Sequence, residues 1–339
     1  MIPPSDLGDH SGVPGTAPSA PSGPCGASGP SGPSGLVIDA GLAALLDKIP
    51  ALDGGPRTVT ELPGGLTNHN YKVTVGGASY VVRVSPPGTD LLSIDRRNEY
   101  LNTVAAAEAG VGAPVIDYLP DDQAMVVGFI DGVTFADESF KAPGVLPRVA
   151  AACRLLHGGP RFVNDFNMFT IQRGYLDLVR ERGFRVPDGY LDFEPQVEEI
   201  RQALAVSDEG TVPCNNDLLA ANFIDDGERI WLIDYEYSGN NDPCFELGNI
   251  WSECHLTADE LADLVTAYYG RFRPSRMARA QLQGQMSRYG WTLWAVIQSA
   301  TSEIDFDFWS WGMEKLDAAA AVFAGPEFPR LLADAAAAD

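Results

Sequence analysis

The sequence predicts an α+β protein with two unequal lobes, a small N-terminal lobe built on an antiparallel sheet and a mainly helical C-terminal lobe. Short strand-like runs separated by Gly and Pro fill residues 57–130, and longer segments with helical spacing of apolar residues follow Gly132. The chain has 339 residues, of which 45% are apolar. It is therefore long enough to bury two cores.

Composition divides the chain into four segments. Residues 1–35 are rich in Pro, Gly and Ser and hold few residues able to build a core, so we expect a disordered tail. The N-lobe is expected over 36–131 and the C-lobe over 132–325. Residues 326–339 are expected to form an Ala-rich C-terminal tail.

In the N-lobe, a helix over 36–49 is expected to precede a three-stranded meander, a second helix and two more strands. The strands are predicted over 58–62, 71–75, 80–84, 115–118 and 124–130, and the second helix over 94–109. In the C-lobe, helices are predicted over 145–157, 170–182, 194–206, 258–272, 277–300 and 311–323. One hairpin is expected among them, with strands over 223–224 and 230–233.

The charge balance is strongly acidic, with 23 Lys and Arg against 46 Asp and Glu and a net charge of −23. Because nucleic acids and anionic membranes are held through clustered basic residues, we expect neither as a partner. The charge suits a cationic ligand, although it equally suits solubility alone. Oligomeric state is left open.

Two further features bear on location. The sequence holds neither a long apolar run nor a basic segment leading into one, so we expect a cytoplasmic protein. The 5 cysteines include no CxxC pair, which predicts reduced thiols rather than disulfides or a zinc ribbon.

The strongest motif places three oxygen-bearing side chains near the predicted hairpin. Asp217 is followed five residues later by Asn222, and Asp234 stands at the end of the second hairpin strand. In phosphoryl transfer, one Asp orients the attacking hydroxyl while an Asn and a later Asp hold Mg²⁺. The alternative is that Asp217 and Asn222 only cap turns.

A second motif lies between the first two strands, where Gly64 and Gly65 precede Thr67 and Asn68. Glycines allow backbone N–H groups to approach phosphates closely, although any hairpin can carry them. Arg83 on the third strand and Glu99 on the following helix provide a cation and an anchoring acid. The alternative for this pair is an ordinary surface ion pair.

A third constellation combines aromatic and acidic residues. Trp291 and Trp294 are three positions apart on a predicted helix and share a face. Indoles beside carboxylates can bind a quaternary ammonium group through cation–π attraction. The alternative is that both are core anchors. Loops of the type GxxxxGK[ST], GxGxxG and GxSxG are absent from the sequence, which argues against P-loop, Rossmann and α/β-hydrolase chemistry.

Together these residues resemble the choline/ethanolamine kinase family, within the aminoglycoside-phosphotransferase-like kinases of protein-kinase-like fold. The resemblance runs from about residue 57 to residue 323. It is carried by these motifs: Gly64-Gly65, Val82-Arg83, Asn216-Asp217-Leu218 to Asn222, Ile233-Asp234-Tyr235-Glu236-Tyr237, and the tryptophan pair with Ser302-Glu303-Ile304-Asp305-Phe306.

The resemblance implies a role for each candidate residue. Asp217 is the catalytic base, and Asn222 and Asp234 are the magnesium ligands. The nucleotide is bound by the N-lobe and the acceptor by the C-lobe. The remaining implied contacts are to ATP from Gly64, Gly65, Thr67, Asn68, Arg83 and Glu99, and to the acceptor from Glu236, Trp291 and Trp294.

Three departures from the family pattern stand out. Asn215 occupies the position of a family His, and its amide can donate a comparable scaffold bond. Glu246 stands where the family generally has Asp. Near Glu253 the sequence does not reveal the further aromatic cluster of the family's choline pocket.

The resulting expectation is an ATP- and Mg²⁺-dependent phosphotransferase acting on the hydroxyl of a small cationic alcohol, most simply choline. The alternatives are a kinase for ethanolamine, thiamine or an aminoglycoside, and a noncatalytic nucleotide-binding pseudokinase.

Overall fold

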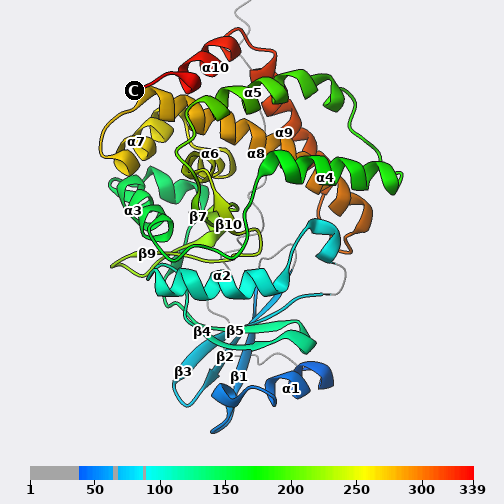
Figure 1. Cartoon of the computed structure of the whole chain (residues 1–339). Coiled ribbons are helices and arrows are strands. Elements are labelled where there is room, and N and C mark those ends of the chain that lie inside the picture. The colour runs from blue at the N-terminus through cyan, green and yellow to red at the C-terminus, as the bar shows by residue number, and fades with distance from the viewer. Residues whose placement is uncertain (1–37, 64–67, 87–88) are drawn as a thin grey trace, which may run out of the picture.

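The computed structural model describes residues 38–63, 68–86 and 89–339, and its two lobes are those expected (Figure 1). A small sheet with one short helix forms one end of the molecule, and a larger bundle of helices forms the other. The predicted disordered tail over 1–35 and the loop residues 64–67 lie outside the described residues.

The N-lobe sheet contains five strands in the spatial order β1-β2-β3-β5-β4, all antiparallel to their neighbours. The strands are β1 (Thr58–Leu62), β2 (His69–Val75), β3 (Ala78–Val84), β4 (Val115–Leu119) and β5 (Ala124–Gly128). All five were predicted, and β2 and β3 each begin two residues before the predicted start. Gly76 and Gly77 both have positive φ, 58° and 86°, as the two-residue turn between β2 and β3 requires.

One face of this sheet carries the N-lobe core. Val59, Val73 and Val82 point to that face and are buried against Leu46, from helix α1 (Ala40–Leu46), and Ile49. Along β2, the buried Val73 and Val75 stand on either side of the half-buried Thr74, which is the pattern of a strand with one face in the core.

Helix α2 (Arg96–Glu108) lies between the sheet and the C-lobe (Figure 1). Asp95 begins it by accepting hydrogen bonds from two backbone N–H groups of the first turn. Some of its buried residues are polar and bond to the C-lobe. The Asn102 amide donates to Asn164 Oδ1 at 2.8 Å and to Ser238 Oγ at 3.0 Å. These bonds hold α2 against the C-lobe.

The C-lobe is built from eight α-helices of the described chain around the long helix α8. They are α3 (Val145–His157), α4 (Met168–Glu181), α5 (Glu194–Val206), α6 (Pro243–Glu253), α7 (Ala258–Tyr269), α8 (Pro274–Thr301), α9 (Phe308–Phe323) and α10 (Phe328–Ala336). Helix α8 packs against α4, α6, α9 and α10. The six predicted helices are all present, with ends shifted by at most three residues.

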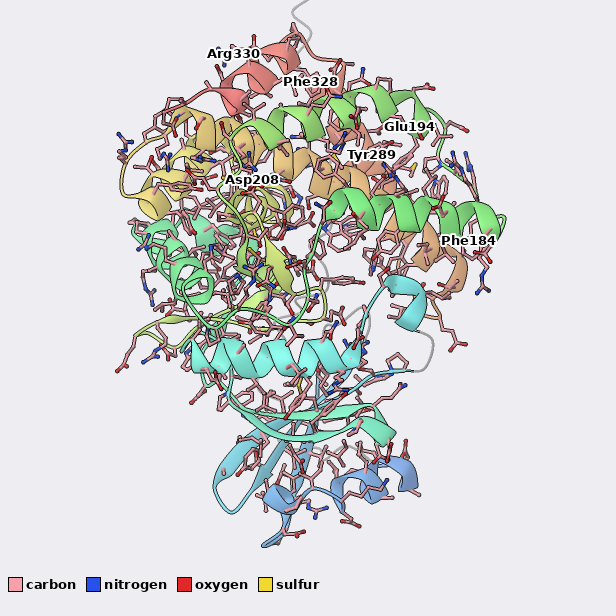
Figure 2. The ribbon with its side chains drawn as sticks, in the orientation of Figure 1. Phe184, Glu194, Asp208, Tyr289, Phe328 and Arg330 are labelled. Carbon is pink, nitrogen blue, oxygen red and sulfur yellow. The ribbon has the colours of Figure 1, made fainter. Side chains whose placement is uncertain are left out.

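Two of these helices were not predicted. Helix α6 is buried on nearly every side, so its sequence lacks the one-sided apolar spacing that identifies a surface helix. Helix α10 lies within residues 326–339, which we expected to be a tail, and it packs against α8 and α5. Its residue Phe328 (Figure 2) is buried and contacts Phe323 of α9. The C-terminal segment is therefore part of the packed C-lobe.

Five short strands and six 3₁₀ turns complete the described chain. The strands are β6 (Val133–Thr134), β7 (Val212–Cys214), β8 (Phe223–Asp225), β9 (Ile230–Leu232) and β10 (Gly239–Asn241), and the 3₁₀ turns are η1 (Pro50–Leu52), η2 (Thr89–Leu92), η3 (Pro120–Asp122), η4 (Asp137–Lys141), η5 (Tyr190–Phe193) and η6 (Ala220–Asn222). The predicted hairpin is β8-β9, whereas β7 pairs with β10. The loop from β7 to β8 and the loop from β9 to β10 therefore run between the same two pairs of strands.

None of the helices within 38–63, 68–86 and 89–339 combines the length and apolar character needed to cross a lipid bilayer.

Candidate active site

The loop after β7 carries Asn215, Asn216 and Asp217, and it is fixed from behind by Glu246 of α6. The carboxylate of Glu246 accepts hydrogen bonds from the backbone N–H of Asn215 at 2.9 Å and of Asn216 at 2.8 Å. Glu246 is completely buried. Its longer side chain in place of Asp therefore still reaches both N–H groups, and charge-assisted bonds of this kind are among the stronger hydrogen bonds in proteins.

Asn215 joins this loop to the segment that carries Asp234. Its amide nitrogen donates to the carbonyl oxygens of Ile233 at 3.1 Å and Asp234 at 2.8 Å. Its amide oxygen accepts from the backbone N–H of Asp217 at 3.1 Å. The expected scaffold bond from Asn215 to neighbouring backbone is present.

Two residues of these loops adopt left-handed backbone conformations. Asn216 has φ 68° and Asp234 has φ 64°. Asn and Asp tolerate this region better than other residues with a Cβ, and such conformations gather at functional sites. The Asn216 amide donates to the carbonyl oxygen of Tyr237 at 3.1 Å, which holds the two loops side by side.

The three predicted oxygen donors lie on these neighbouring loops. The amide of Asn222 donates to the backbone oxygen of Asp217 at 2.7 Å, which leaves the Asn222 Oδ1 atom as an acceptor. Burial raises the pKa of Asp217 well above its ordinary value, and the negative charges of Asp234, Glu236 and Glu253 raise it further. The charge of Asp234 therefore reaches the Asp217 carboxyl.

Arg83 of β3 lies at the centre of a buried ionic cluster that links the lobes. Its guanidinium group contacts Glu99 Oε1 at 3.3 Å, Asp234 Oδ1 at 2.7 Å and Glu236 Oε2 at 3.0 Å. Burial alone would lower the pKa of Arg83, but the charges of these three carboxylates outweigh burial and raise it. The predicted pairing of Arg83 with Glu99 is present, and it is buried rather than at the surface.

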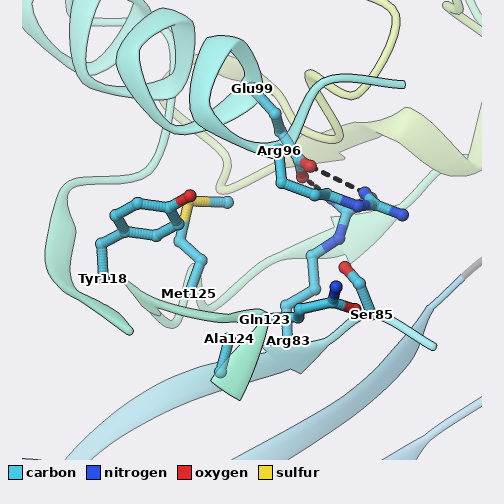
Figure 3. A pocket seen from close by; sticks show the side chains of 8 residues that line it. All are labelled: Arg83, Ser85, Arg96, Glu99, Tyr118, Gln123, Ala124 and Met125. Carbon is cyan, nitrogen blue, oxygen red and sulfur yellow. Dashed lines mark hydrogen bonds and ion pairs between the residues drawn. The ribbon is translucent and has the colours of Figure 1, made fainter. Parts of the chain in front are cut away.

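Arg96, at the start of α2, is a second cation in this cluster. The sequence analysis did not predict its role. Its Nη1 atom lies 2.7 Å from Glu99 Oε2 and 3.2 Å from Glu236 Oε2. Figure 3 shows Arg83, Arg96 and Glu99 meeting at one side of a small cavity. This cavity, of about 10 Å³, has the size of a single water molecule. The only sequence signal was an Arg three positions before Glu99 on the same helix.

Glu236 and Asn68 also belong to this cluster. The Asn68 amide donates to Glu236 Oε2 at 2.9 Å, and Asn68 Oδ1 accepts from the Ser85 hydroxyl at 2.7 Å. The structure thus brings Glu236, an expected acceptor contact, to the arginine side of the site. Three predicted nucleotide contacts, Gly64, Gly65 and Thr67, lie outside the described residues.

The predicted tryptophan pair lies on α8 against Tyr237. Trp294 Nε1 donates to the Tyr237 hydroxyl at 2.6 Å, and the Trp291 ring lies edge-on to the Tyr237 ring with centroids 4.9 Å apart. Both indoles are nearly fully buried. Tyr237 follows Glu236, and its backbone oxygen accepts a hydrogen bond from the Asn216 amide, which places this aromatic group beside the 215–217 loop.

The aromatic group extends to two residues of α9. Trp311 of α9 packs edge-on against Trp294 with ring centroids 5.7 Å apart, and Phe308 packs on the same indole at 5.8 Å. Beside Trp311, Lys315 pairs with Glu253 of α6. These rings of α9 therefore lie on the same side as Glu253 although they are far from it in the chain, so the sequence next to Glu253 does not reveal them.

Behind the 215–217 loop, three buried side chains with metal-binding atoms lie together. His157 Nε2 is 3.6 Å from both Cys214 Sγ and Glu246 Oε1, and His157 Nδ1 is 2.7 Å from the Tyr268 hydroxyl. Glu246 already accepts hydrogen bonds from two backbone N–H groups of the loop. We therefore interpret His157 and Cys214 as residues that hold Glu246 in place rather than as metal ligands.

The fold and this site define a class of protein, the two-lobed kinase-type phosphotransferases, in which two polar loops lie side by side near a strand cation paired to a helix acid. Comparison with known proteins supports this class. The family model described as choline/ethanolamine kinase matches residues 59–267, so the chain belongs to the choline/ethanolamine kinase family. It is an enzyme of the phosphotransferase class with an alcohol group as acceptor.

Three similar proteins illustrate the relationship. A solved structure of a choline/ethanolamine kinase family protein from Mesorhizobium loti is 33% identical, with a TM-score of 0.76, and covers 87% of this chain and 99% of that one. Protein LicA of Haemophilus influenzae is 28% identical over 76% of this chain and 77% of its own length. A probable ethanolamine kinase of Arabidopsis thaliana is 25% identical over 76% of this chain and 77% of its own length.

Proposed function

We propose that this chain transfers the γ-phosphoryl group of ATP to the hydroxyl of choline in a Mg²⁺-dependent reaction. The observation that carries the proposal is that Asp217, Asn222 and Asp234 lie on neighbouring loops and that Asp234 belongs to the ionic cluster of Arg83. Oxygen donors, a base and buried cations are the parts that phosphoryl transfer requires.

In this proposal Asp217 is the catalytic base. Its carboxylate orients the acceptor hydroxyl and receives its proton as the phosphoryl group is transferred. The raised pKa of Asp217 supports this role, because a stronger base accepts a proton more readily. The anchored loop, held by Glu246 and Asn215, keeps the carboxylate in position.

Asn222 and Asp234 fit a magnesium ion by their chemistry. Both supply oxygen atoms, and Mg²⁺ takes few protein ligands, typically one or two carboxylates together with substrate phosphates. The Asn222 amide nitrogen donates to the backbone oxygen of Asp217, so the Oδ1 atom of Asn222 can face the ion. When bound, the ion would neutralise charge on the nucleotide phosphates. Arg83, ordered by Glu99, would bind a phosphate, and Gly64, Gly65, Thr67 and Asn68 would line the nucleotide.

The aromatic group formed by Tyr237, Trp291, Trp294 and Trp311 supports choline as the acceptor. A trimethylammonium group has no N–H donors, so aromatic walls bind it without leaving unpaired hydrogen bonds. Ethanolamine is the second candidate, because a probable ethanolamine kinase is among the proteins to which this chain is similar.

A coupled assay of ADP release tests the proposal. The purified chain would be given ATP and Mg²⁺ with choline, ethanolamine, thiamine or an aminoglycoside in turn. We expect release with choline to exceed release with the other alcohols, at a turnover of about 1–100 per second. Nucleotide binding without acceptor-dependent ADP release would instead identify a pseudokinase, and faster release with thiamine or an aminoglycoside would reject choline.

A further inference from the structure

Glu253 and Lys315 form a buried ion pair at the edge of the aromatic group. The Lys315 Nζ atom lies 2.7 Å from Glu253 Oε1 and 2.6 Å from Glu253 Oε2, so the ammonium group contacts both carboxylate oxygens. The Lys315 side chain is 10% exposed and the Glu253 side chain is 7% exposed. Glu253 ends α6 and Lys315 lies in α9, so the pair depends on how these helices pack.

The same ammonium group also lies against an aromatic ring. Lys315 Nζ is 4.1 Å from the centroid of the Trp311 ring, within cation–π distance. Trp311 in turn contacts Trp294. A primary ammonium group from the chain itself therefore fills a corner made of one carboxylate and one indole face, which is the environment that a primary ammonium ligand would seek.

This corner adjoins the catalytic base. Cys254, the residue after Glu253, places its Sγ atom 3.5 Å from the backbone oxygen of Leu218, the residue after Asp217. In line with this contact, the charge of Glu253 raises the pKa of Asp217 and that of Lys315 lowers it. The other carboxylates that act on Asp217 are Asp234 and Glu236, and both contact Arg83. Each of these three neighbouring carboxylates is thus already matched by a cation of the chain.

The two candidate acceptors respond differently to such a site. The ammonium group of ethanolamine carries three N–H donors, and burying them without acceptors is costly. The trimethylammonium group of choline carries none and needs only aromatic faces and shape. A site whose carboxylate is occupied therefore disfavours the primary ammonium and leaves the quaternary one unaffected.

We propose that Lys315 determines acceptor specificity: by occupying the corner between Glu253 and Trp311, it denies that carboxylate to a primary ammonium group and selects choline over ethanolamine. The inference rests on the proposed function and refines it. Lys315 is a specificity-determining residue here, whereas Asp217 remains the base.

The test compares Lys315→Met with the wild-type chain, using kcat/KM for choline and for ethanolamine. Lys315→Met frees the carboxylate of Glu253, so we expect kcat/KM for ethanolamine to rise and the choline-to-ethanolamine ratio to fall at least about tenfold, as a charge-assisted hydrogen bond would allow. Lys315→Arg should retain the wild-type preference. The matched control is Lys48→Met, which removes a lysine of an exposed ion pair with Asp122 in the N-lobe.

The double variant Glu253→Gln with Lys315→Met separates specificity from packing. It removes the lysine and the carboxylate together, which is better tolerated than removing one partner of a buried pair. Without the carboxylate, ethanolamine should gain nothing. An equal gain in the double variant would show that space, rather than the freed charge, changed the preference, and would overturn the proposal.

A measurement on the wild-type chain needs no variant to fold. Tetramethylammonium should compete with choline at least about tenfold better than methylammonium does, because only the latter needs hydrogen-bond acceptors. Equal competition, a wild-type preference for ethanolamine, or an unchanged ratio in folded Lys315→Met would each refute the role of Lys315 while the proposed kinase activity stands. Absence of ADP release with both acceptors would instead refute the proposed function, and this inference with it.

Discussion

Arg83 and Asp234 are 151 positions apart in the chain, yet the Arg83 Nη2 atom donates to Asp234 Oδ1 at 2.7 Å. This bond joins the N-lobe sheet to the second acidic loop of the C-lobe. Glu99 and Glu236 contact the same guanidinium group, so the nucleotide side of the proposed site and the interface between the lobes are one structure.

The first prediction concerns Asp217. Asp217→Asn keeps the size of the side chain and removes its ability to accept a proton, so acceptor-dependent ADP release should fall at least about 100-fold, the lower range for a lost general base. Nucleotide binding, measured by thermal shift with ATP and Mg²⁺, should largely survive. Asp188→Asn, at a highly exposed position, is the control. Undiminished turnover in Asp217→Asn would remove it from the proposed chemistry.

The same variant should be more stable than the wild type at neutral pH. The folded state raises the pKa of Asp217 above its ordinary value of 3.8, so between these two pKa values the folded chain binds more protons than the unfolded one. Stability then falls as pH rises through this interval. Asp217→Asn lacks this loss, and in Mg²⁺-free buffer its melting temperature should exceed that of the wild type at pH 8.

The gain should shrink as the pH is lowered toward 4, where the wild-type carboxyl is protonated in the folded state. Asp188→Asn should show no such trend. A gain of equal size at both pH values would mean that the stabilisation does not come from the ionisation of Asp217.

Arg83 is predicted to stabilise the fold as well as to bind phosphate. Arg83→Met leaves the buried carboxylates of Glu99, Asp234 and Glu236 without their shared partner, and breaking such a cluster costs about 3–5 kcal/mol of unfolding free energy. Urea unfolding measures this loss. Arg330→Met, which removes the cation of an exposed pair on α10, should change the unfolding free energy by less than about 1 kcal/mol (Figure 2). Similar losses in both variants would contradict the central position given to Arg83.

Glu246 is predicted to be a positioning residue. Glu246→Gln keeps one acceptor oxygen and replaces the other with an amide, so one of the two backbone N–H groups of Asn215 and Asn216 loses its partner. We expect a loss of about 1–3 kcal/mol in unfolding free energy. The turnover number should fall while the KM for ATP changes little, because Asp217 rather than Arg83 is displaced. The exposed Glu199→Gln is the control, and an effect on the KM for ATP alone would argue against the role.

Local patterns predicted much of this protein. The N-lobe strands and the hairpin β8-β9 have alternating or apolar runs bounded by Gly, Pro and Asp, which define strands and turns over a few residues. Asp217, Asn222 and Asp234 lie within one short stretch, so loop and hairpin geometry alone bring them close. The substitution of Asn215 for a His was also interpretable, because an amide can make the same backbone bond.

Only the tertiary structure decided which distant side chains meet. Glu246, Arg96 and the pair Glu253–Lys315 belong to helices whose sequences show charged residues but not their partners. Helix α6 escaped prediction because burial on all sides removes the periodic polar face. A charge in a sequence is equally compatible with solvent and with a buried partner. The choice depends on the packing of helices far apart in the chain, which no local pattern contains.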